Sequence, residues 1–307
     1  MIKKPTISVI MTVYNGEAFL FSAIESVLTQ TYSNWELIII NDASSDKTLN
    51  IIQNYLSQDK RIKLINNQYN LGRAISRNLG LKKALGDYIA ILDSDDISLP
   101  ERLEKEKNFL DFNRSYFLVG CGAWHINKNN KIIGSFQPLT KFSLIKKKLP
   151  KQNCFYHSTI MFRNINFLYR EKFFYAQDYD FFLQLLLKNK KMTNLKQPLI
   201  KYRLHHHSAS VEKQLEQFLF AQKAQEFYYQ KNTTNHDKYS IFDPNSIIHY
   251  DLKSVKNPTI LKLLIRKNFF LGQHDQVKKI CHLYFKLYGY GNKNLLFYFL
   301  SFFKNII

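Results

Sequence analysis

Between residues 7 and 92 the chain alternates between near-continuous apolar runs and stretches in which apolar residues recur at helical spacing. The first pattern is typical of strands covered on both faces, and the second is typical of helices with one apolar face. The order is strand, helix, strand, helix, strand, helix, strand, which predicts a parallel sheet with helices packed on both faces. The predicted strands are residues 7–13, 35–40, 62–65 and 88–92. The predicted helices include one opened by Ser44 or Ser45 as N-cap and one from about 73 to 85.

The pattern is more mixed beyond residue 97. Ser98 and Glu101 have the spacing of a capping box, with Pro100 between them, which predicts the start of another helix. Short apolar runs predict further strands at residues 116–124, 131–136, 155–162 and 196–204. Helical spacing predicts helices at 178–190 and 209–230.

The C-terminal part of the chain differs in composition from the rest. Residues 231–246 are polar and mixed, which favours a linker between a main α/β domain, residues 1–230, and a helical C-terminal region, residues 231–307. Residues 252–307 contain ten Lys or Arg and a single acid, Asp275, and end in an aromatic-rich stretch. Two interpretations remain open: a helical subdomain packed on the main domain, or helices lying on anionic lipid.

The overall composition narrows the class of partner and the compartment. The 307-residue chain has a formal net charge of +20, which favours an anionic partner such as a nucleic acid, a phosphorylated small molecule or a lipid headgroup. The three cysteines, Cys121, Cys154 and Cys281, fit neither a disulfide framework nor a zinc site. No run reaches the ~18 apolar residues that a membrane-spanning helix needs. We therefore expect a cytoplasmic protein, with peripheral contact to the inner face of the cytoplasmic membrane as an option.

Polar side chains gather where the predicted parallel strands end. Thr12 and Tyr14 follow the first strand, Asp42 the second, and Asp93 and Asp95 the fourth. Ligands of such sheets bind outside the carboxyl ends of the strands. Side chains two apart on an extended segment face the same way, so the last two carboxylates can share one site. Because Mg²⁺ and Mn²⁺ prefer carboxylate and phosphate oxygens, the sequence predicts a divalent cation bridging the protein to a diphosphate.

Other functions explain the sequence less well. The absence of a GxGxxG motif argues against a dinucleotide-dependent oxidoreductase. A nucleotidyltransferase that makes sugar nucleotides would need a glycine-rich basic loop, whereas residues 11–18 contain one glycine and no Lys or Arg. A nucleic-acid-binding protein would suit the charge, but no such motif is present and the carboxylates would repel phosphates without a metal. A catalytically inactive scaffold is a further alternative.

Several stretches together carry a resemblance to a known family. They are "ISVIMTVYNGEAFL", "WELIIINDASSDKT", "NLGRAISRNLGL", "DYIAILDSDD", "HSTIMFR", "QDYDFFLQLL" and "YRLHHHSAS". Over roughly residues 5–210 the chain resembles family 2 glycosyltransferases with the GT-A fold. The resemblance implies a nucleotide-sugar donor, commonly a UDP-sugar, a Mn²⁺ or Mg²⁺ ion, and transfer with inversion at the anomeric carbon. It also implies a saccharide or lipid-linked saccharide acceptor in the synthesis of surface polysaccharide or lipooligosaccharide.

The same resemblance implies roles for the residues at the strand ends. Thr12, Tyr14 and Asp42 correspond to positions at the uracil and ribose. Asp93 corresponds to a position near the ribose and the metal, and Asp95 to a metal ligand. Whether the neighbouring Asp96 shares that role or only turns the chain is left open.

Basic side chains add further candidates to the site. Arg73 and Arg77 precede the acidic stretch and are candidates for contact with the donor's phosphates or sugar, with surface or salt-bridge roles as the alternative. His205 matches the histidine of the family's Tyr-Arg-x-His stretch, which implies contact with the metal or the diphosphate. His157 fits a core or loop residue as well as it fits an acceptor contact.

The resemblance places the catalytic base at Asp178. The family has a Glu-Asp pair that opens a helix, and this chain has Gln177 and Asp178 there. Asp178 would take the proton from the acceptor hydroxyl, and a metal at Asp95 would stabilise the departing diphosphate. Asp180 is the competing carboxylate, but two residues along a helix turn it ~200° away from Asp178.

Overall fold

The computed structural model describes residues 4–205, 213–248, 257–270 and 273–289. Contacts divide the chain into two units, residues 1–205 with 224–240, and residues 206–223 with 241–307. Helix α8 (Gln214–Thr234) therefore contributes residues to both units. Each unit is described by itself below.

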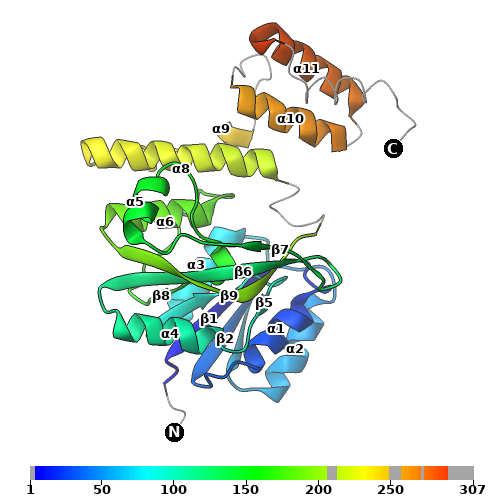
Figure 1. Cartoon of the computed structure of the whole chain (residues 1–307). Coiled ribbons are helices and arrows are strands. Elements are labelled where there is room, and N and C mark those ends of the chain that lie inside the picture. Colours follow the sequence, from blue (N-terminus) through cyan, green and yellow to red (C-terminus); the bar gives the residue numbers. More distant parts are fainter. Residues whose placement is uncertain (1–3, 206–212, 249–256, 271–272, 290–307) are drawn as a thin grey trace. The chain divides into compact units, whose positions relative to one another are not determined.

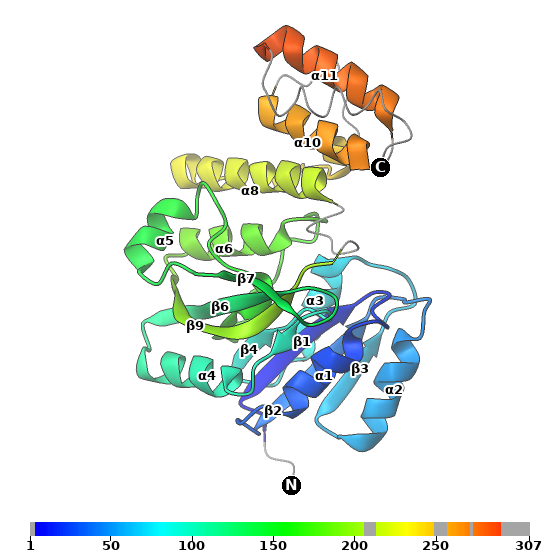
Figure 2. The same ribbon diagram turned by 45° about the vertical axis from the view of Figure 1, so that its right-hand side comes forward.

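The first unit contains the predicted parallel sheet. Strands β1 (Ile7–Val13), β2 (Trp35–Asn41), β3 (Ile62–Asn66) and β4 (Tyr88–Ile91) pair in parallel in the order β3-β2-β1-β4 (Figures 1 and 2). They alternate along the chain with three helices, α1 (Leu20–Leu28), α2 (Thr48–Gln58) and α3 (Arg73–Lys83). This half of the fold confirms the sequence prediction.

Helices cover both faces of these strands. Helices α1, α2 and α4 (Arg102–Phe112) are labelled in Figure 2. Their apolar residues pack with Val9, Met11 and Leu37 in one large core. Helix α3 lies on the other face, where Gly80 allows close contact with the side chains of Ile10 and Ile40. Because successive strand residues point to opposite faces, each strand can be apolar throughout and still bury every side chain.

The sheet continues with strands of mixed direction. Beyond β4 come β8 (Met161–Arg163), β6 (Tyr116–Ile126), β9 (Lys191–Arg203) and β5 (Ile97–Ser98), and β7 (Ile132–Phe136) pairs with β6. Strand β8 runs antiparallel to β4 and β6, whereas β6 and β9 run parallel to each other. Helices α5 (Phe142–Lys148) and α6 (Gln177–Leu187) complete the unit.

The structure differs from the sequence prediction at several local points. The strand predicted at 155–162 is reduced to β8, because residues His157–Thr159 form a 3₁₀ turn, η1, in which Thr159 Oγ1 donates to the carbonyl of Tyr156. Neither Ser44 nor Ser45 caps α2. The helix begins at Thr48, and the amide of Thr48 donates to the side chain of Asp46. The helix predicted at 209–230 is described from residue 214 to 234, and residues 209–212 lie outside the described part.

The described part of the second unit is helical, as predicted for the C-terminal region. It contains α9 (Asn245–Ile248), α10 (Pro258–Phe270) and α11 (His274–Tyr288). The last two helices share a small core that includes Leu261, Leu264, Ile280 and Cys281. The aromatic-rich end of the chain lies within residues 290–307, which are outside the described part. Among the described residues, no helix combines the length and the apolar character needed to cross a membrane.

Residues 231–246, predicted as a linker, begin with the last turn of α8. Residues 235–240 follow and belong to the first unit, where Asp237 and Tyr239 contact Arg170 and Lys172. Of the predicted linker, only residues 241–246 belong to the second unit.

Candidate active site

The carboxyl ends of the parallel strands lie at one edge of the sheet. The registers pair Val13 with Asn41, Asn41 with Asn66, and Ile10 with Ile91. The residues that follow these strands are therefore neighbours, and the amide of Asp42 donates to the carbonyl of Val13 over 2.9 Å. The structure thus brings the polar clusters that follow β1, β2 and β4 to a common edge.

Asp42 organises the loop that opens α3. Its buried carboxylate accepts hydrogen bonds from the amides of Leu71 and Gly72 and from the side chain of Asn67, each at 2.9 Å. Gly72 has a φ of 82°, a conformation that favours glycine. Close to Asp42 in the sheet, Tyr14 leaves 54% of its surface exposed, so its ring is available to a ligand.

The turns after β1 and β2 are joined by reciprocal hydrogen bonds that sequence reasoning missed. Asn15, at a φ of 49°, donates its amide to Ser44 Oγ, and its side-chain oxygen accepts the amide of Ser45. Glu17 and Lys47 continue the pattern: the amide of Glu17 donates to Asp46, and the amide of Lys47 donates to Glu17. The positive φ explains why a residue that tolerates the left-handed region stands at position 15.

Asp93 is held as a carboxylate by a buried arginine. Arg77 Nη2 donates to Asp93 Oδ1 over 2.7 Å, and the amide of Asp93 donates to Ser158 Oγ. Burial raises the pKa of Asp93, but Arg77, with a smaller contribution from His157, outweighs it and holds that pKa well below its ordinary value. Arg77 is therefore a salt-bridge partner of Asp93 inside the site, whereas Arg73 is exposed at the start of α3.

Asp95 and Asp96 have different environments. Asp95 is about one third exposed, and its Oδ2 lies 3.0 Å from His205 Nε2. Asp96 is buried, and its Oδ1 accepts the amide of Arg203 over 2.8 Å. Burial and the neighbouring carboxylates of Asp95 and Asp93 raise the pKa of Asp96 well above its ordinary value. Asp96 is thus turned away from solvent, whereas Asp95 is partly exposed.

The residues present fit a divalent cation that a ligand helps to hold. The Asp95 carboxylate and the His205 imidazole, 3.0 Å apart, are donor types that Mn²⁺ accepts. Such ions commonly take one or two protein carboxylates and complete their shell with water and substrate phosphates. Within the described ranges, no group of three His, Cys, Asp or Glu side chains that could hold a metal ion is found.

Of the two carboxylates at the start of α6, only Asp178 is accessible. Asp178 is partly exposed, and its Oδ2 accepts a hydrogen bond from Asn153 Nδ2 over 3.2 Å. Asp180 is completely buried, where it accepts hydrogen bonds from Arg170 and Gln184. An acceptor hydroxyl can therefore approach Asp178 and cannot approach Asp180.

His157 lies beside Asp93. It is buried, its Nε2 is 2.8 Å from the hydroxyl of Tyr169, and its Nδ1 is 3.9 Å from Asp93 Oδ1. Burial and then Arg77 lower the pKa of His157, while Asp93 and Asp178 act in the opposite direction.

Comparison with known proteins decides the family. The model of glycosyl transferase family 2 matches residues 8–176 of the 307-residue chain. The chain belongs to this family. It is a glycosyltransferase, and its family and the solved structures described below confirm the predicted GT-A fold with C-terminal helices.

Named relatives and solved structures agree with this assignment. An uncharacterized glycosyltransferase of Methanocaldococcus jannaschii is 39% identical over 66% of this chain and 71% of its own length. The Escherichia coli UDP-Glc:alpha-D-GlcNAc-diphosphoundecaprenol beta-1,3-glucosyltransferase WfgD is 36% identical over 67% of this chain and 80% of its own length. For a putative glycosyltransferase of Bacillus subtilis, EpsE, the matched stretch covers 43% of the relative. Residues 1–349 of Staphylococcus aureus TarS superpose with a TM-score of 0.58 at 18% identity, covering 91% of this chain and 83% of that one. The same part of TarS has been solved with UDP and with UDP-GlcNAc.

Proposed function

We propose that this glycosyltransferase moves a sugar from a UDP-sugar to a saccharide carried on a lipid diphosphate, with inversion and with the help of a divalent cation. The observation that carries the proposal is that Asp178, at the start of α6, is accessible and hydrogen-bonded by Asn153, while Arg77 holds Asp93 ionised at the edge of the sheet. The donor class is supported by the TarS complexes with UDP and UDP-GlcNAc. The acceptor class is supported by the name of the E. coli relative, which acts on a diphosphoundecaprenol-linked sugar.

The nucleotide end of the donor fits the edge formed by β1 and β2. The exposed ring of Tyr14 can lie against the uracil, and Thr12 and Asp42 can hydrogen-bond the uracil and ribose. Arg77 and Arg73 lie at the start of α3, close to where the sugar and phosphates would follow. A Mn²⁺ or Mg²⁺ ion held by Asp95 and His205, beside Asp93, would stabilise as a Lewis acid the negative charge that grows on the diphosphate.

The base acts on the acceptor. The Asp178 carboxylate accepts the proton of the attacking hydroxyl as its oxygen forms a bond to the anomeric carbon. The bond from that carbon to the phosphate oxygen breaks, and its electron pair leaves with UDP. Because attack and departure occur on opposite sides of the same carbon, the configuration inverts. Asn153 fixes one carboxylate oxygen and so directs the proton acceptor toward the hydroxyl.

Replacing the base tests the proposal directly. Asp178→Asn removes the proton acceptor and keeps the side-chain shape, so the transfer rate should fall by ~10²- to 10⁴-fold. The measurement is release of free UDP from a panel of UDP-sugars, with thermal melting in UDP and Mn²⁺ as a check on donor binding. We expect the variant to show the same UDP-dependent rise in melting temperature as the wild type.

Three results would contradict parts of this proposal. Release of pyrophosphate in place of UDP would indicate a nucleotidyltransferase. Stabilisation by an oligonucleotide but not by UDP would indicate a nucleic-acid-binding protein. Full activity after treatment with EDTA would exclude the proposed cation, whereas loss that Mn²⁺ restores would support it.

A further inference from the structure

The first turn of α6 is held by side chains on both sides of the base. Asn153 donates to Asp178, the hydroxyl of Tyr179 donates to the carbonyl of Leu149 over 2.7 Å, and Asp180 accepts from Arg170. The turn follows Ala176, which has a φ of 52°, so the chain reverses sharply just before the base. Asp178 lies within this turn. The contacts of Tyr179 and Asp180, the next two residues, therefore help to fix the direction of the Asp178 carboxylate.

One of these contacts extends to helix α8. Gln225 Nε2 donates to the hydroxyl of Tyr179 over 3.0 Å and to the carbonyl of Lys151 over 2.9 Å. Lys151 stands two residues before Asn153, the residue that hydrogen-bonds the base. Gln225 therefore ties the first turn of α6 to the loop that orients Asp178.

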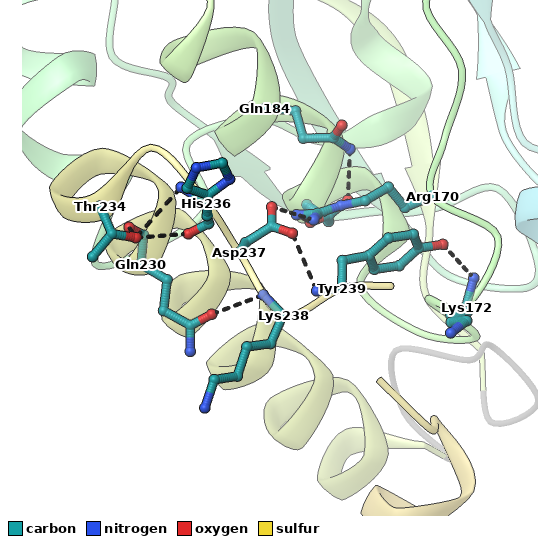
Figure 3. A network of polar contacts seen from close by, with 10 residues as sticks. Arg170, Lys172, Gln184, Gln230, Thr234, His236, Asp237, Lys238 and Tyr239 are labelled. Carbon is teal, nitrogen blue, oxygen red and sulfur yellow. Dashed lines mark hydrogen bonds and ion pairs between the residues drawn. The ribbon is translucent and has the colours of Figure 1, made fainter. Parts of the chain in front are cut away.

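A second contact reaches the segment after α8. The guanidinium of Arg170 donates to Asp180 through Nε over 2.9 Å and to Asp237 through Nη1 over 3.0 Å (Figure 3). Its central carbon lies 4.7 Å from the ring centre of Tyr239 and 5.3 Å from that of Phe227. Arginine is thus fixed between a carboxylate of α6 and a carboxylate of residues 235–240, with aromatic rings on its faces.

Residues 235–240 are themselves held in place by hydrogen bonds. The amide of Lys172 donates to the hydroxyl of Tyr239 over 3.0 Å, and the Lys172 ammonium donates to the carbonyl of Ser240. The amide of Lys238 donates to Gln230 on α8 over 3.1 Å, as Figure 3 shows. The backbone that carries Asp237 is therefore held by hydrogen bonds of the residues that follow it.

Helix α6, Gln225 and Asp237 lie beyond the part of the chain that the family model matches. That match ends at residue 176, one residue before α6 begins. Within the first unit, Gln225 bonds Tyr179, the neighbour of the base in sequence, and the carbonyl of Lys151, two residues before Asn153. Asp237 bonds Arg170, which in turn bonds Asp180 of α6. None of these bonds involves the residues of the donor edge.

We propose that Gln225 and Asp237 are positioning residues for the general base, so that residues 224–240 are a functional part of the transferase site. The inference rests on the proposed role of Asp178. A displacement of ~1 Å can lower a reaction rate by ~100-fold. Small shifts of the first turn of α6 are therefore sufficient to slow the transfer. Loss of these contacts should slow the chemical step and leave donor binding intact. The turns after β1 and β2, proposed to bind the donor, are held by their own hydrogen bonds.

The test uses the full chain with Gln225→Met, Asp237→Asn and the double variant. Methionine keeps the length of Gln225 without its hydrogen bonds, and asparagine keeps the shape of Asp237 without its charge. We expect kcat to fall by ~10-fold or more in the double variant, with the KM for the UDP-sugar and the UDP-induced rise in melting temperature unchanged. Hydrogen exchange of the peptide covering 177–187 should become faster in the same variants, which is a readout independent of activity.

Asp59→Asn is the matched control. Asp59 pairs with Arg61 at 2.7 Å and leaves 20% of its side chain exposed, close to the 13% of Asp237, but it lies just before β3, far from α6 in the fold. This variant should lose a similar amount of thermal stability and keep its kcat.

The outcomes separate the two proposals. Wild-type kcat in the double variant, with Asp178→Asn inactive, would overturn the positioning role and leave the proposed function standing. A fall in kcat accompanied by equal weakening of UDP binding, or matched by Asp59→Asn, would also overturn it. Activity retained by Asp178→Asn would instead remove the base on which the inference rests.

Discussion

At the scale of single residues, the site depends on how neighbouring groups set charge. Asp93 and Asp96 are three positions apart, and the structure shifts their pKa values in opposite directions. The difference arises because Arg77 faces Asp93, whereas Asp96 is buried against the backbone of Arg203. One carboxylate is thus kept charged by Arg77, and the other is buried and accepts a backbone amide.

Arg77→Met should move the pH dependence of the reaction. The pKa of Asp93 is depressed in the folded protein, so its charged form is present above that low pKa and is lost only in strong acid. Without Arg77 the remaining burial raises this pKa, and the acid limb of the kcat/KM profile should shift to higher pH. The measurement is kcat/KM for the UDP-sugar across the acid range.

Arg73→Met is the comparison variant. Arg73 is exposed and makes the smallest of the contributions that lower the pKa of Asp93. The acid limb of the kcat/KM profile should therefore move less in Arg73→Met than in Arg77→Met. Equal profiles for the wild type and Arg77→Met would contradict the assignment of Arg77 as the group that holds Asp93 ionised.

The sequence located the acidic residues of the site better than their partners. Asp42, Asp93 and Asp95 could be placed at one edge because they follow apolar strands, a short-range pattern. The role of His157 and the choice of Asn153 as partner of Asp178 depend on segments that meet only after folding. The catalytic and ligand roles stay predictions, whereas the relative positions of the side chains are described by the structure.

At the scale of elements, the start of α3 connects the fold to the donor site. The carboxylate of Asp42 holds the amides of Leu71 and Gly72, and α3 then carries Arg77 toward Asp93. The positive φ of Gly72 permits this geometry. A change of backbone at position 72 is therefore transmitted to both ends of the proposed donor site.

Gly72→Ala should lower both stability and donor affinity. An added Cβ meets nothing within 4 Å, so the cost of about 1–3 kcal/mol comes from the backbone alone, because a φ of 82° with a ψ of 163° is essentially restricted to glycine. Relief of that strain moves the amides away from Asp42 and weakens UDP binding. Thermal melting and UDP titration measure the two effects.

A second glycine provides the control for this variant. Gly289, at the end of α11, has a φ of 76° and equally open surroundings. Gly289→Ala should cost similar stability and leave UDP binding unchanged. If both variants bind UDP as the wild type does, the Asp42 loop does not serve the donor.

Prediction of the elements succeeded where long-range context and local pattern agree. The first four strands follow from apolar runs alone, because both of their faces are buried. The strand predicted at 155–162 was wrong over most of its length, since the hydroxyl of Thr159 closes a tight turn that competes with the extended chain. The N-cap predicted at Ser44 or Ser45 was wrong because Asn15 binds both serines.

At the scale of the whole molecule, the basic surface of the C-terminal unit bears on where the enzyme works. Lys279 and Lys286 of α11 are exposed, and the acid Asp275 in the first turn lies 3.9 Å from Lys278. We propose a cytoplasmic enzyme bound peripherally to the inner face of the membrane, because the proposed acceptor is anchored there. The sequence could not place the boundary between the units, since residues 235–240 look like a linker in composition and are fixed only by tertiary contacts.

Binding to vesicles tests this proposal. Each basic residue near an anionic surface contributes ~1 kcal/mol, so Lys279→Gln with Lys286→Gln should weaken binding by ~30-fold. Co-sedimentation with vesicles containing an anionic phospholipid, at low and high salt, measures it. The control is Lys82→Gln with Lys83→Gln, which removes the same charge from exposed positions of α3. Equal binding by both double variants would show that α11 is not the contact.

The hydrogen bonds that join the turns after β1 and β2 have a consequence for turnover. The amides of Asn15, Glu17, Ser45 and Lys47 make these bonds within the chain itself, so the region expected to receive uridine is preorganised. On the proposed function, that region serves free UDP as well as the UDP-sugar, so the by-product is expected to compete with fresh substrate.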